Sequence, residues 1–370
     1  MENKKILLIT NQSNTVINFR KDLILYLQSL KNTVYVVSGD DIRKVEIEKL
    51  GVDFKCIKFN NRSKNPFSLI SLKRKLKIYI SKLKPDIVLT FQIKPNIIGT
   101  TASAKCGINN VFAFVEGLGD PFQPKSLLDK IMLHFIVALY RSGLKRTKLV
   151  YFLNDDDKKE FVYRKIVPAK KTTVIKGIGI DTDFFRPPDA PNDENNVLMI
   201  SRLIKNKGIF EYCQIARKTR EIRKDIVFYL CGGEGQIKIK DIDQYIVTKD
   251  IVYLGEVKDV RPILSKCKIY VSTSYREGFP RTIMEAMAMG KPTFASNVIG
   301  NKELVVDGTT GYLFEKQDID GFSKKITEMI DSNQLDSLGR NARKICVQNY
   351  DSRIINKTII EMIDSLLSLG

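Results

Sequence analysis

The sequence predicts an α/β protein built from two parallel β-sheets, each covered by helices on both faces. Short runs of apolar and β-branched residues alternate with segments of helical periodicity, and this rhythm occurs twice along the 370 residues. The composition agrees with two domains, because a chain of this length with 43% apolar residues can form two separate cores.

The expected strands divide evenly between the two halves of the chain. In the first half they span residues 6–10, 33–38, 86–90, 110–114, 149–153 and 173–175. In the second half they span residues 197–200, 226–231, 251–254, 269–272, 292–295 and 311–314. Prolines and turn-forming residues between the halves predict a linker over 184–196. We therefore expect an N-terminal domain over 1–183, a C-terminal domain over 197–350, and a final amphipathic helix over 351–370.

The charge of the chain is concentrated in its first half. Residues 1–180 hold 33 Lys and Arg against 15 Asp and Glu, whereas residues 181–370 hold 28 against 27. A field of this kind favours a polyanionic partner, either nucleic acid or an anionic membrane surface. The alternative is a lysine-rich bias that only solvates the surface, although a general bias would affect both halves.

Two segments of the first half are candidates for contact with a membrane. Residues 62–84 carry eight basic residues and no acidic residue, with leucine and isoleucine at helical spacing. Either this helix packs on the sheet and shows its lysines to water, or its basic face meets anionic head groups. The apolar part of residues 127–149 is shorter than the roughly 20 residues that span a bilayer. It is a core helix or one that dips into the membrane surface.

Other features of the composition indicate a cytoplasmic protein with no metal site. The six cysteines are scattered and form no CxxC pair, as expected for thiols in a reducing compartment. The start MENKKILLIT predicts a buried strand and lacks the longer apolar run of a signal peptide. Residues 155–157 are three aspartates after Asn154, which indicates a helix start and not a metal motif. The single histidine, His134, is expected to be a packed core residue.

The strongest chemical signal is REGFPRTIMEAMAMGKP, in which seven residues separate Glu277 from Glu285. The expected strand 269–272 precedes this segment, so Glu277 should lie on the loop at the carboxyl end of the strand. Glu285 should lie in the helix that follows. Ligands of open parallel sheets bind at this edge, where helix N-termini favour phosphate groups.

Two further segments follow predicted strands of the second half. In MISRLIKNKG, Arg202 and Lys207 are well placed to hold a diphosphate, which an arginine can bind with two hydrogen bonds. In VFYLCGGEGQ, Gly232 and Gly233 allow the backbone to approach a ligand closely, although the segment does not fit GxGxxG.

These three segments, in this order and with VVDGTTGYLF at 305–314, resemble the C-terminal half of retaining GT-B glycosyltransferases of family four. The resemblance implies a GT-B fold, in which two Rossmann-like domains face a cleft and the last helix crosses back onto the N-terminal domain. It also implies a hexosyltransferase that uses a nucleotide sugar and needs no metal or other cofactor.

The resemblance assigns roles to individual residues of the C-terminal half. Glu285 should bind the ribose hydroxyls and Glu277 the donor sugar. Arg202 and Lys207 should hold the diphosphate and stabilise the charge that grows on the leaving group. The remaining expected donor-binding residues lie on the loops at the same edge: Gly232, Gly233, Gly278, Phe279 and Pro280.

Segments of the N-terminal half are similar to a narrower bacterial group of this family, which extends polyprenyl-diphosphate-linked oligosaccharides for glycoproteins, O-antigens or capsules. The segments that carry this likeness are NFRKDLI, IKPNIIGTTAS, FAFVEGLGDPF and YFLNDDDKKEF. The VEGLG form is most similar to transferases that add GalNAc to a diacetylbacillosamine-bearing lipid. This likeness implies UDP-GalNAc as the donor, a lipid-linked acceptor and a peripheral position on the inner face of the cell membrane.

The N-terminal half supplies the candidate acceptor residues. Glu116 follows a strand and precedes two glycines, so it either assists deprotonation of the acceptor hydroxyl or caps the next helix. Arg20, Lys94 and Asn96 also follow expected strands. They either hold the diphosphate of the acceptor or are ordinary surface and capping residues.

Other functions remain open at this point. One alternative is a transferase of the same kind of pathway that uses another UDP-sugar or a GDP-sugar as its donor. A sugar-nucleotide 2-epimerase shares the expected fold and nucleotide, but has little need for a basic domain. A nucleic-acid-binding protein would explain the charge, but the chain lacks a recognisable reading motif and would leave Glu277 and Glu285 without a purpose. We therefore expect no nucleic-acid partner.

Overall fold

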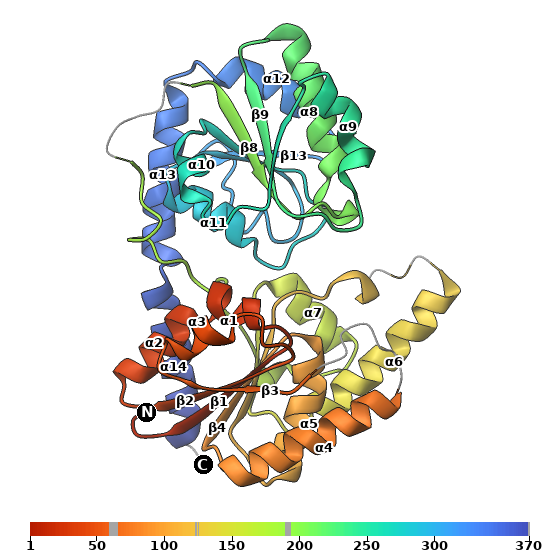
Figure 1. Ribbon diagram of the computed structural model, residues 1–370, viewed down its shortest axis with the longest axis vertical. Helices are drawn as coiled ribbons and strands as arrows, with labels where there is room; N and C mark the ends of the chain where they lie inside the picture. The colour runs from red at the N-terminus through yellow and green to blue at the C-terminus, as the bar shows by residue number, and fades with distance from the viewer. Residues whose placement is uncertain (59–65, 123, 125, 189–193, 369–370) are drawn as a thin grey trace. The chain divides into compact units, whose positions relative to one another are not determined.

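The computed structural model describes residues 1–58, 66–122, 124, 126–188 and 194–368, and it divides the chain into two compact units (Figure 1). Unit 1 comprises Met1–Gly179 and Ser352–Gly370, and unit 2 comprises Ile180–Asp351. Each unit contains one sheet, and every strand pair in both sheets is parallel, which confirms the predicted fold class. Among the described residues, no helix is long and apolar enough to cross a membrane.

Unit 1 is built on a sheet of seven strands in the order β3-β2-β1-β4-β5-β6-β7. The strands are β1 (Lys5–Thr10), β2 (Thr33–Ser38), β3 (Asp53–Cys56), β4 (Ile87–Phe91), β5 (Val111–Val115), β6 (Leu149–Phe152) and β7 (Thr172–Val174). All residues of β4 and β5 are buried. Such strands read as continuous apolar runs because helices cover both faces of the sheet.

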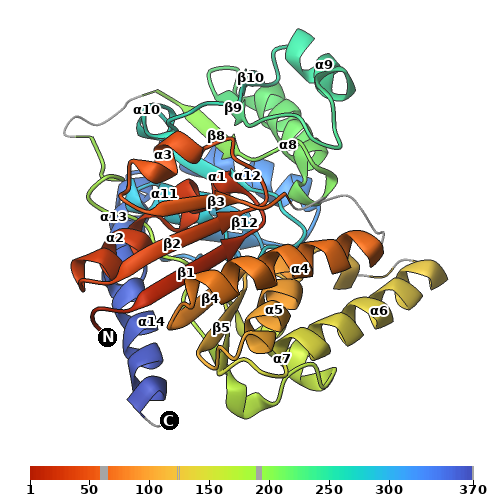
Figure 2. The ribbon, with the colours of Figure 1, turned by 60° about the horizontal axis from the view of Figure 1, so that its bottom comes forward.

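Helices cover both faces of this sheet (Figures 1 and 2). One face carries α1 (Ser13–Phe19), α2 (Lys21–Ser29), α3 (Lys44–Glu48) and α14 (Ser352–Ser368). The other carries α4 (Pro66–Leu83), α5 (Thr100–Lys105), α6 (Leu127–Leu144) and α7 (Asp155–Tyr163), with a π-helical turn η1 (Pro95–Gly99) before α5. Short 3-10 turns lie at η2 (Asp120–Phe122) and η3 (Ala169–Lys171).

The last helix of the chain, α14, packs in unit 1 against α2. The amino group of Met1 forms an ion pair with Asp364, and Lys148 donates a hydrogen bond to the carbonyl of Leu366. The N-terminal domain was expected to extend to residue 183, but unit 2 already begins at Ile180. The amide of Ile180 donates a hydrogen bond to the backbone carbonyl of Tyr350, so the segments where the chain enters and leaves unit 2 lie side by side.

Three details of unit 1 differ from the sequence expectations. The sequence analysis missed β3, a short edge strand whose charged Asp53 is exposed, so it lacks a long apolar run. His134 is exposed on α6, where its Nδ1 lies 2.7 Å from the carbonyl of Lys130, so the expectation of a core position was wrong. The expected helix over 62–84 is α4, and residues 62–65 lie outside the described residues.

The aspartates at 155–157 form the first turn of α7, as predicted. The Asn154 side chain accepts a hydrogen bond of 2.7 Å from the amide of Asp157. This contact is an N-terminal cap, and the three acidic side chains are favourable at the positive end of the helix dipole.

Unit 2 is built on a sheet of six strands in the order β10-β9-β8-β11-β12-β13. The strands are β8 (Asn196–Ile200), β9 (Val227–Cys231), β10 (Val252–Gly255), β11 (Ile269–Ser272), β12 (Thr293–Ser296) and β13 (Gly311–Phe314). Its helices are α8 (Ile209–Ile222), α9 (Ile239–Val247), α10 (Arg261–Ser265), α11 (Arg281–Ala288), α12 (Ile319–Met329) and α13 (Gln334–Asn349), with a 3-10 turn η4 (Lys205–Lys207). β8 takes up Asn196 from the expected linker, and residues 189–193 lie outside the described residues.

Candidate active site

The winding direction of the sheet in unit 2 changes between its two central strands, β8 and β11. From β8 the chain winds outward to β9 and β10, and from β11 it winds outward to β12 and β13. The loops after β8 and β11 therefore diverge at the carboxyl edge of the sheet, which is where open parallel sheets bind ligands. Apart from Glu285, which lies in α11, the expected donor residues lie on these loops and on the loop after β9.

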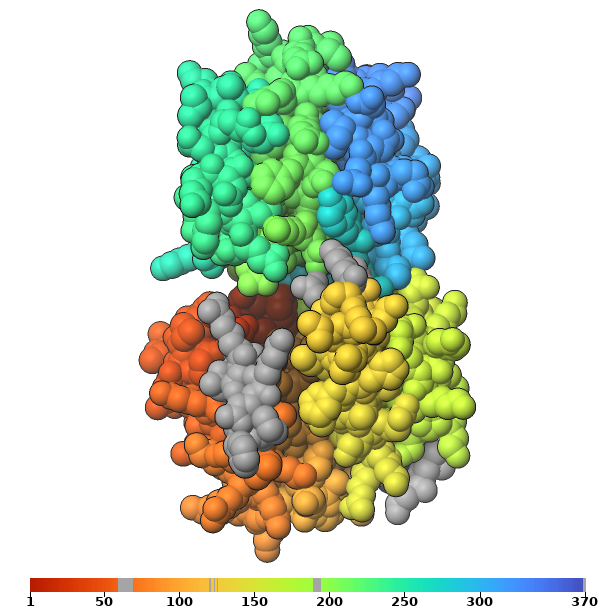
Figure 3. Space-filling model, turned by 90° about the vertical axis from the view of Figure 1, so that its right-hand side faces the viewer, coloured from red at the N-terminus to blue at the C-terminus, as the bar shows by residue number. Residues whose placement is uncertain are grey.

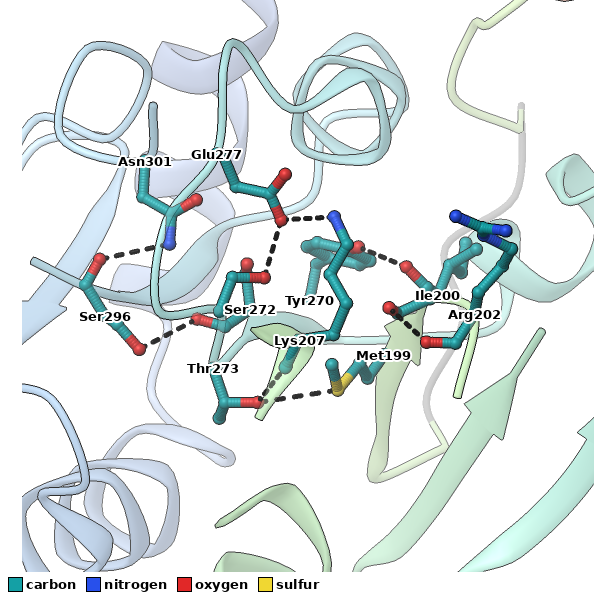
Figure 4. Close-up of polar contacts among 12 residues, drawn as sticks. Met199, Ile200, Arg202, Lys207, Tyr270, Ser272, Thr273, Glu277, Ser296 and Asn301 are labelled. Carbon is teal, nitrogen blue, oxygen red and sulfur yellow. Dashed lines mark hydrogen bonds and ion pairs between the residues drawn. The ribbon is translucent and has the colours of Figure 1, made fainter. Parts of the chain in front are cut away.

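The structure joins two of the predicted residues directly at this edge (Figure 4). The Lys207 ammonium donates to a carboxylate oxygen of Glu277 over 2.5 Å, and the Ser274 hydroxyl donates to the same oxygen over 2.6 Å. The Glu277 side chain is 12% exposed and that of Lys207 is 28% exposed. A partly buried ammonium and a partly buried carboxylate thus lie together at this edge, where a ligand can reach both.

Backbone contacts fix the loop that carries Glu277. The amide of Glu277 donates to the carbonyl of Ile299 over 2.9 Å, and the amide of Tyr275 donates to Asn206 over 2.9 Å. Gly300 has a φ of +93°, and a Cβ at this position would lie 2.5 Å from the Cβ of Glu277. Neither Ser274 nor Gly300 was predicted from the sequence. Gly300 could have been found, because it is a glycine in the short loop that follows the buried strand β12.

The other expected diphosphate ligand, Arg202, stands apart from this pair. Its exposed side chain forms no hydrogen bond or ion pair with the part of the chain that the structure describes, and Figure 4 shows it on the side of Lys207 away from Glu277. Gly232 lies against the same loop, since a Cβ there would be 2.0 Å from the carbonyl oxygen of Ser201. Gly232 is therefore required for close packing of the loops after β8 and β9.

Glu285 lies in α11 and is almost fully buried, at 8% exposure. Burial raises the pKa of its carboxyl group, and the nearby Arg281, which donates a hydrogen bond of 2.8 Å to it, opposes this shift. Phe279 and Pro280 are also buried, and Phe279 packs edge-to-face on Tyr350 with the ring centroids 5.6 Å apart. Their side chains shape the loop, whereas Gly278 stays partly accessible.

Unit 1 has its own change of winding direction, between β1 and β4, and a pocket of about 540 Å³ opens there. This volume is in the range of small-molecule sites. Residues that follow β1, β4 and β5 line it, together with Tyr140 of α6. The lining set is Asn11, Gln12, Gln92, Ile93, Lys94, Asn96, Val115, Glu116, Gly117 and Tyr140.

Two lining residues that the sequence analysis missed join the ends of β1 and β4. The side-chain oxygen of Gln92 accepts a hydrogen bond of 2.9 Å from the amide of Asn11, and Gln92 has an uncommon φ of +72°. The side-chain oxygen of Asn11 is buried and has no hydrogen-bond partner among the described residues. An unsatisfied acceptor in a pocket favours a ligand that donates a hydrogen bond.

Glu116 lines the pocket and is held by Arg20, which forms an ion pair with it. The Arg20 side chain is only 4% exposed, and its guanidinium lies 4.1 Å from the centre of the Phe91 ring. That Arg20 binds the diphosphate of the acceptor stays a prediction, and the structure shows its buried guanidinium paired with Glu116. The role that the geometry supports for Arg20 is to orient this carboxylate.

Asn96 also lines this pocket, and its side chain is hydrogen-bonded within unit 1. It is fully buried, accepts a hydrogen bond from Thr90 over 2.8 Å and donates one to the carbonyl of Phe114 over 2.7 Å. The amide thus ties η1 to the sheet. Lys94 is partly buried in the pocket lining, and desolvation lowers the pKa of its ammonium group. Lys94 is thus a predicted acceptor-binding cation that lines this pocket.

No cluster of three or more potential metal-ligating side chains occurs in the described ranges of the chain. The candidate sites hold paired cations and carboxylates instead. The absence of a metal requirement stays a prediction.

Two parallel-sheet units with polar loops at their carboxyl edges define the fold class of GT-B glycosyltransferases, and comparison with known proteins agrees. Residues 181–345 match the family described as glycosyl transferases group 1, and residues 5–154 match the family described as glycosyl transferase 4-like. The two matches together span most of the chain. The chain thus carries both domains of a GT-B glycosyltransferase, a 4-like domain followed by a group 1 domain.

Curated relatives of the chain act in glycan assembly. The N,N'-diacetylbacillosaminyl-diphospho-undecaprenol alpha-1,3-N-acetylgalactosaminyltransferase of Campylobacter jejuni is 26% identical, over 97% of this chain and 98% of its own length. The UDP-Gal:alpha-D-GlcNAc-diphosphoundecaprenol alpha-1,3-galactosyltransferase of Escherichia coli is 27% identical, over 82% of this chain and 78% of its own length.

Solved structures share the fold across the whole chain. Anabaena Alr3699/HepE in complex with UDP and glucose has a TM-score of 0.82 at 21% identity, covering 98% of this chain and 100% of that one. A glycosyltransferase from Rickettsia africae has a TM-score of 0.81 at 20% identity and covers both chains fully. These likenesses establish the fold.

The raised pKa of Glu285 predicts that its ionised carboxylate lowers the free energy of unfolding, by an amount that depends on pH. The folded protein retains the proton at a pH where the unfolded chain has lost it, so stability falls as pH rises through the raised pKa. We expect Glu285→Gln to have a higher Tm than the unmodified protein at pH 7, by about 2–4 °C for each kcal/mol gained in the free energy of unfolding. The gain should disappear at about pH 4, near the usual carboxyl pKa.

Thermal unfolding followed by circular dichroism between these pH values measures this effect. Glu328→Gln is a matched control, because the exposed carboxylate of Glu328 pairs with Lys325 at the surface. A Tm difference for Glu285→Gln that did not vary with pH would contradict the assignment.

Proposed function

We propose that the chain is a retaining glycosyltransferase that moves a hexose or N-acetylhexosamine to a polyprenyl-diphosphate-linked saccharide. GalNAc from UDP-GalNAc is the first candidate donor. The observation that carries the proposal is the Lys207–Glu277 pair at the point where the sheet of unit 2 changes its winding direction. The names of the Campylobacter and Escherichia relatives support the lipid-linked acceptor.

Unit 2 binds the nucleotide sugar in this proposal. Arg202 and Lys207 hold the diphosphate, and they stabilise the negative charge that grows on it as the bond to the sugar breaks. Lys207 is already held by Glu277, so a phosphate that arrives at Lys207 brings the sugar close to the Glu277 carboxylate. Glu277 then accepts hydrogen bonds from the sugar hydroxyls.

Glu285 binds the hydroxyls of the ribose, and Arg281 keeps its carboxylate in place. A buried carboxylate costs stability when it is ionised, and this cost is expected at a site that is built for binding. The backbone of Gly232, Gly233 and Gly278 lines the approach to the nucleotide.

Unit 1 binds the acceptor saccharide in the pocket at the ends of β1, β4 and β5. The unsatisfied oxygen of Asn11 accepts a hydrogen bond from a sugar hydroxyl, and Lys94 is placed for an anionic group of the acceptor. Glu116, oriented by Arg20, assists the loss of the proton from the hydroxyl that reacts.

In the transfer step the acceptor oxygen forms a bond to C1 of the donor sugar, and the bond between C1 and the diphosphate oxygen breaks. The hydroxyl proton passes to Glu116 or to the departing nucleoside diphosphate, which leaves with the bonding electron pair. Retention of the anomeric configuration is proposed from the family. Two cations on the diphosphate supply the charge stabilisation that a metal ion provides in other transferases. The proposed location is cytoplasmic, peripheral on the inner face of the cell membrane.

Release of nucleoside diphosphate by the purified protein tests this proposal. We expect release from UDP-GalNAc only when a polyprenyl-diphosphate-linked amino-sugar acceptor is added, and a loss of about 100-fold or more for Glu277→Ala. Lys205→Ala is a matched control, because Lys205 is an exposed lysine of the same loop.

The outcomes of this assay separate the parts of the proposal. Release with UDP-Gal or a GDP-sugar instead would keep the transferase and replace the donor. Conversion of a UDP-sugar without any acceptor would indicate an epimerase. Failure to bind any nucleotide would overturn the assignment of unit 2.

The role of Glu116 predicts a separate effect on turnover. We expect Glu116→Gln to lower kcat by about 100-fold, as for other general bases, with little change in the affinity for the nucleotide. Arg20→Lys should lower kcat less, because an ammonium keeps the charge but not the fork of donors. Unchanged turnover in Glu116→Gln would exclude this role. Glu46→Gln, at an exposed ion pair of the same unit, is the control.

A further inference from the structure

The helix α6 of unit 1 has two apolar faces on opposite sides. One face packs into the core of unit 1 and consists of Leu133, Val137, Tyr140 and Leu144. The other face is open to solvent, with side chains that are between 54% and 77% exposed. It consists of Leu127, Leu128, Ile131 and Phe135, which we call the apolar tip of α6.

The spacing of the apolar tip makes it one continuous surface. Leu127, Ile131 and Phe135 are four positions apart and Leu128 is three before Ile131, so at roughly 100° per residue the four share one side of the helix, about 180° from the buried set. A helix that needs only one apolar face for its own fold gains nothing from this second one. Clustered exposure of large apolar side chains is typical of a surface that binds a partner.

Basic side chains surround this side of unit 1. On α4 the exposed side chains include Arg74, Lys75, Lys77 and Lys82, together with the apolar Ile70 and Ile78. Burial and the like charge of Lys105 lower the pKa of Lys73, so cations are crowded here. Because α5 and η1 lie between α4 and α6 and contact both, the two helices cover the same face of the sheet (Figure 2).

The surface of α6 and that of α4 are visible on one side of unit 1 in the space-filling view (Figure 3). The topology relates this side to the pocket. Since α6 follows β5, its first turns lie toward the carboxyl edge of the sheet, where the pocket opens. A surface that contacts the apolar tip is therefore on the same edge as Glu116.

We propose that the apolar tip of α6 inserts into the interfacial region of a membrane leaflet, while the basic side chains of α4 contact its anionic head groups. The inference rests on the proposed function, since it names the surface on which a lipid-linked acceptor is met. Apolar side chains buried at the acyl boundary and cations at the head groups are the pattern of interfacial helices.

Charge decides between a membrane and a second copy of the chain as the occupant. Unit 1 holds 35 Lys and Arg against 17 Asp and Glu, a net charge of +18, whereas unit 2 has a net charge of only +1. Two copies of unit 1 would repel each other, whereas an anionic leaflet attracts this unit. The apolar tip adds a contribution that salt does not screen, so binding should persist in part at high salt.

The chain contains no tryptophan, so a single introduced tryptophan reports on insertion without background. Phe135→Trp is mixed with vesicles of phosphatidylcholine and phosphatidylglycerol, without donor or acceptor. We expect a blue shift of the emission and quenching by brominated lipid. Val247→Trp is the matched control, because Val247 is 71% exposed on α9 of unit 2, and its emission should not shift.

Sedimentation of the protein with the same vesicles tests the contribution of the tip. The double variant L128E/I131E should bind at least about tenfold more weakly, a change of roughly 1.4 kcal/mol. Its Tm should be unchanged, because both side chains are exposed. The variant I222S/V247S, which alters exposed apolar residues of unit 2, should bind as the unmodified protein does.

Two results would overturn the inference. The first is vesicle binding with no emission shift of Phe135→Trp and no effect of L128E/I131E, which would mean attachment by charge alone. The second is a lipid-free dimer that L128E/I131E abolishes, which would mean that a second copy covers the tip. Transferase activity is not part of the readout. Loss of the proposed function would therefore show in the transfer assay, and loss of this inference in the vesicle assay.

Discussion

The order of the strands is the constraint on which the candidate sites depend. Each sheet is wholly parallel and changes its winding direction between two central strands, β1 and β4 in unit 1 and β8 and β11 in unit 2. The loops after these strands diverge, and the carboxyl edge at this point is where open parallel sheets bind ligands. The pocket of unit 1 and the Lys207–Glu277 pair of unit 2 occur at these two positions.

The candidate sites share a second property, because each predicted catalytic or binding carboxylate is paired with a cation. Glu277 pairs with Lys207, Glu285 with Arg281, and Glu116 with Arg20. A carboxylate at a half-buried edge loses part of its hydration, and a cation nearby keeps it ionised and oriented. Such preorganisation is useful for binding a polar ligand, because the side chains need little rearrangement when the ligand arrives. The side chain of Arg202 is exposed and forms no hydrogen bond or ion pair with the described part of the chain, so a ligand can reach it directly.

The fold could be predicted from the sequence because buried parallel strands are apolar along their whole length. β3 was missed for the converse reason, since this edge strand is short and carries Asp53 and Lys55. Arg202 and Glu277 could be placed at the carboxyl edge of the sheet because they lie on loops that follow such strands, and Glu285 because it lies in the helix that comes next. The partners could not be predicted, because the contact of Ser274 with Glu277 depends on the turn within one loop, and those of Gly300 and Arg20 depend on how separate segments pack. The burial of Asn96 and Arg20 could not be predicted, since both follow strands and only packing shows that they are buried. The exposure of the apolar tip of α6 was likewise undecided in the sequence, in which both faces of the helix are apolar.

The central claim is that unit 2 recognises a nucleotide sugar through the cations of its edge and through Glu277. Calorimetric titration with UDP and with UDP-GalNAc, for the unmodified protein and for Glu277→Gln, tests it most directly. We expect the unmodified protein to bind UDP-GalNAc more tightly than UDP, and Glu277→Gln to bind UDP about as well but without the additional affinity for the sugar. Equal affinity for UDP and UDP-GalNAc in both proteins, or no binding of UDP at all, would contradict it.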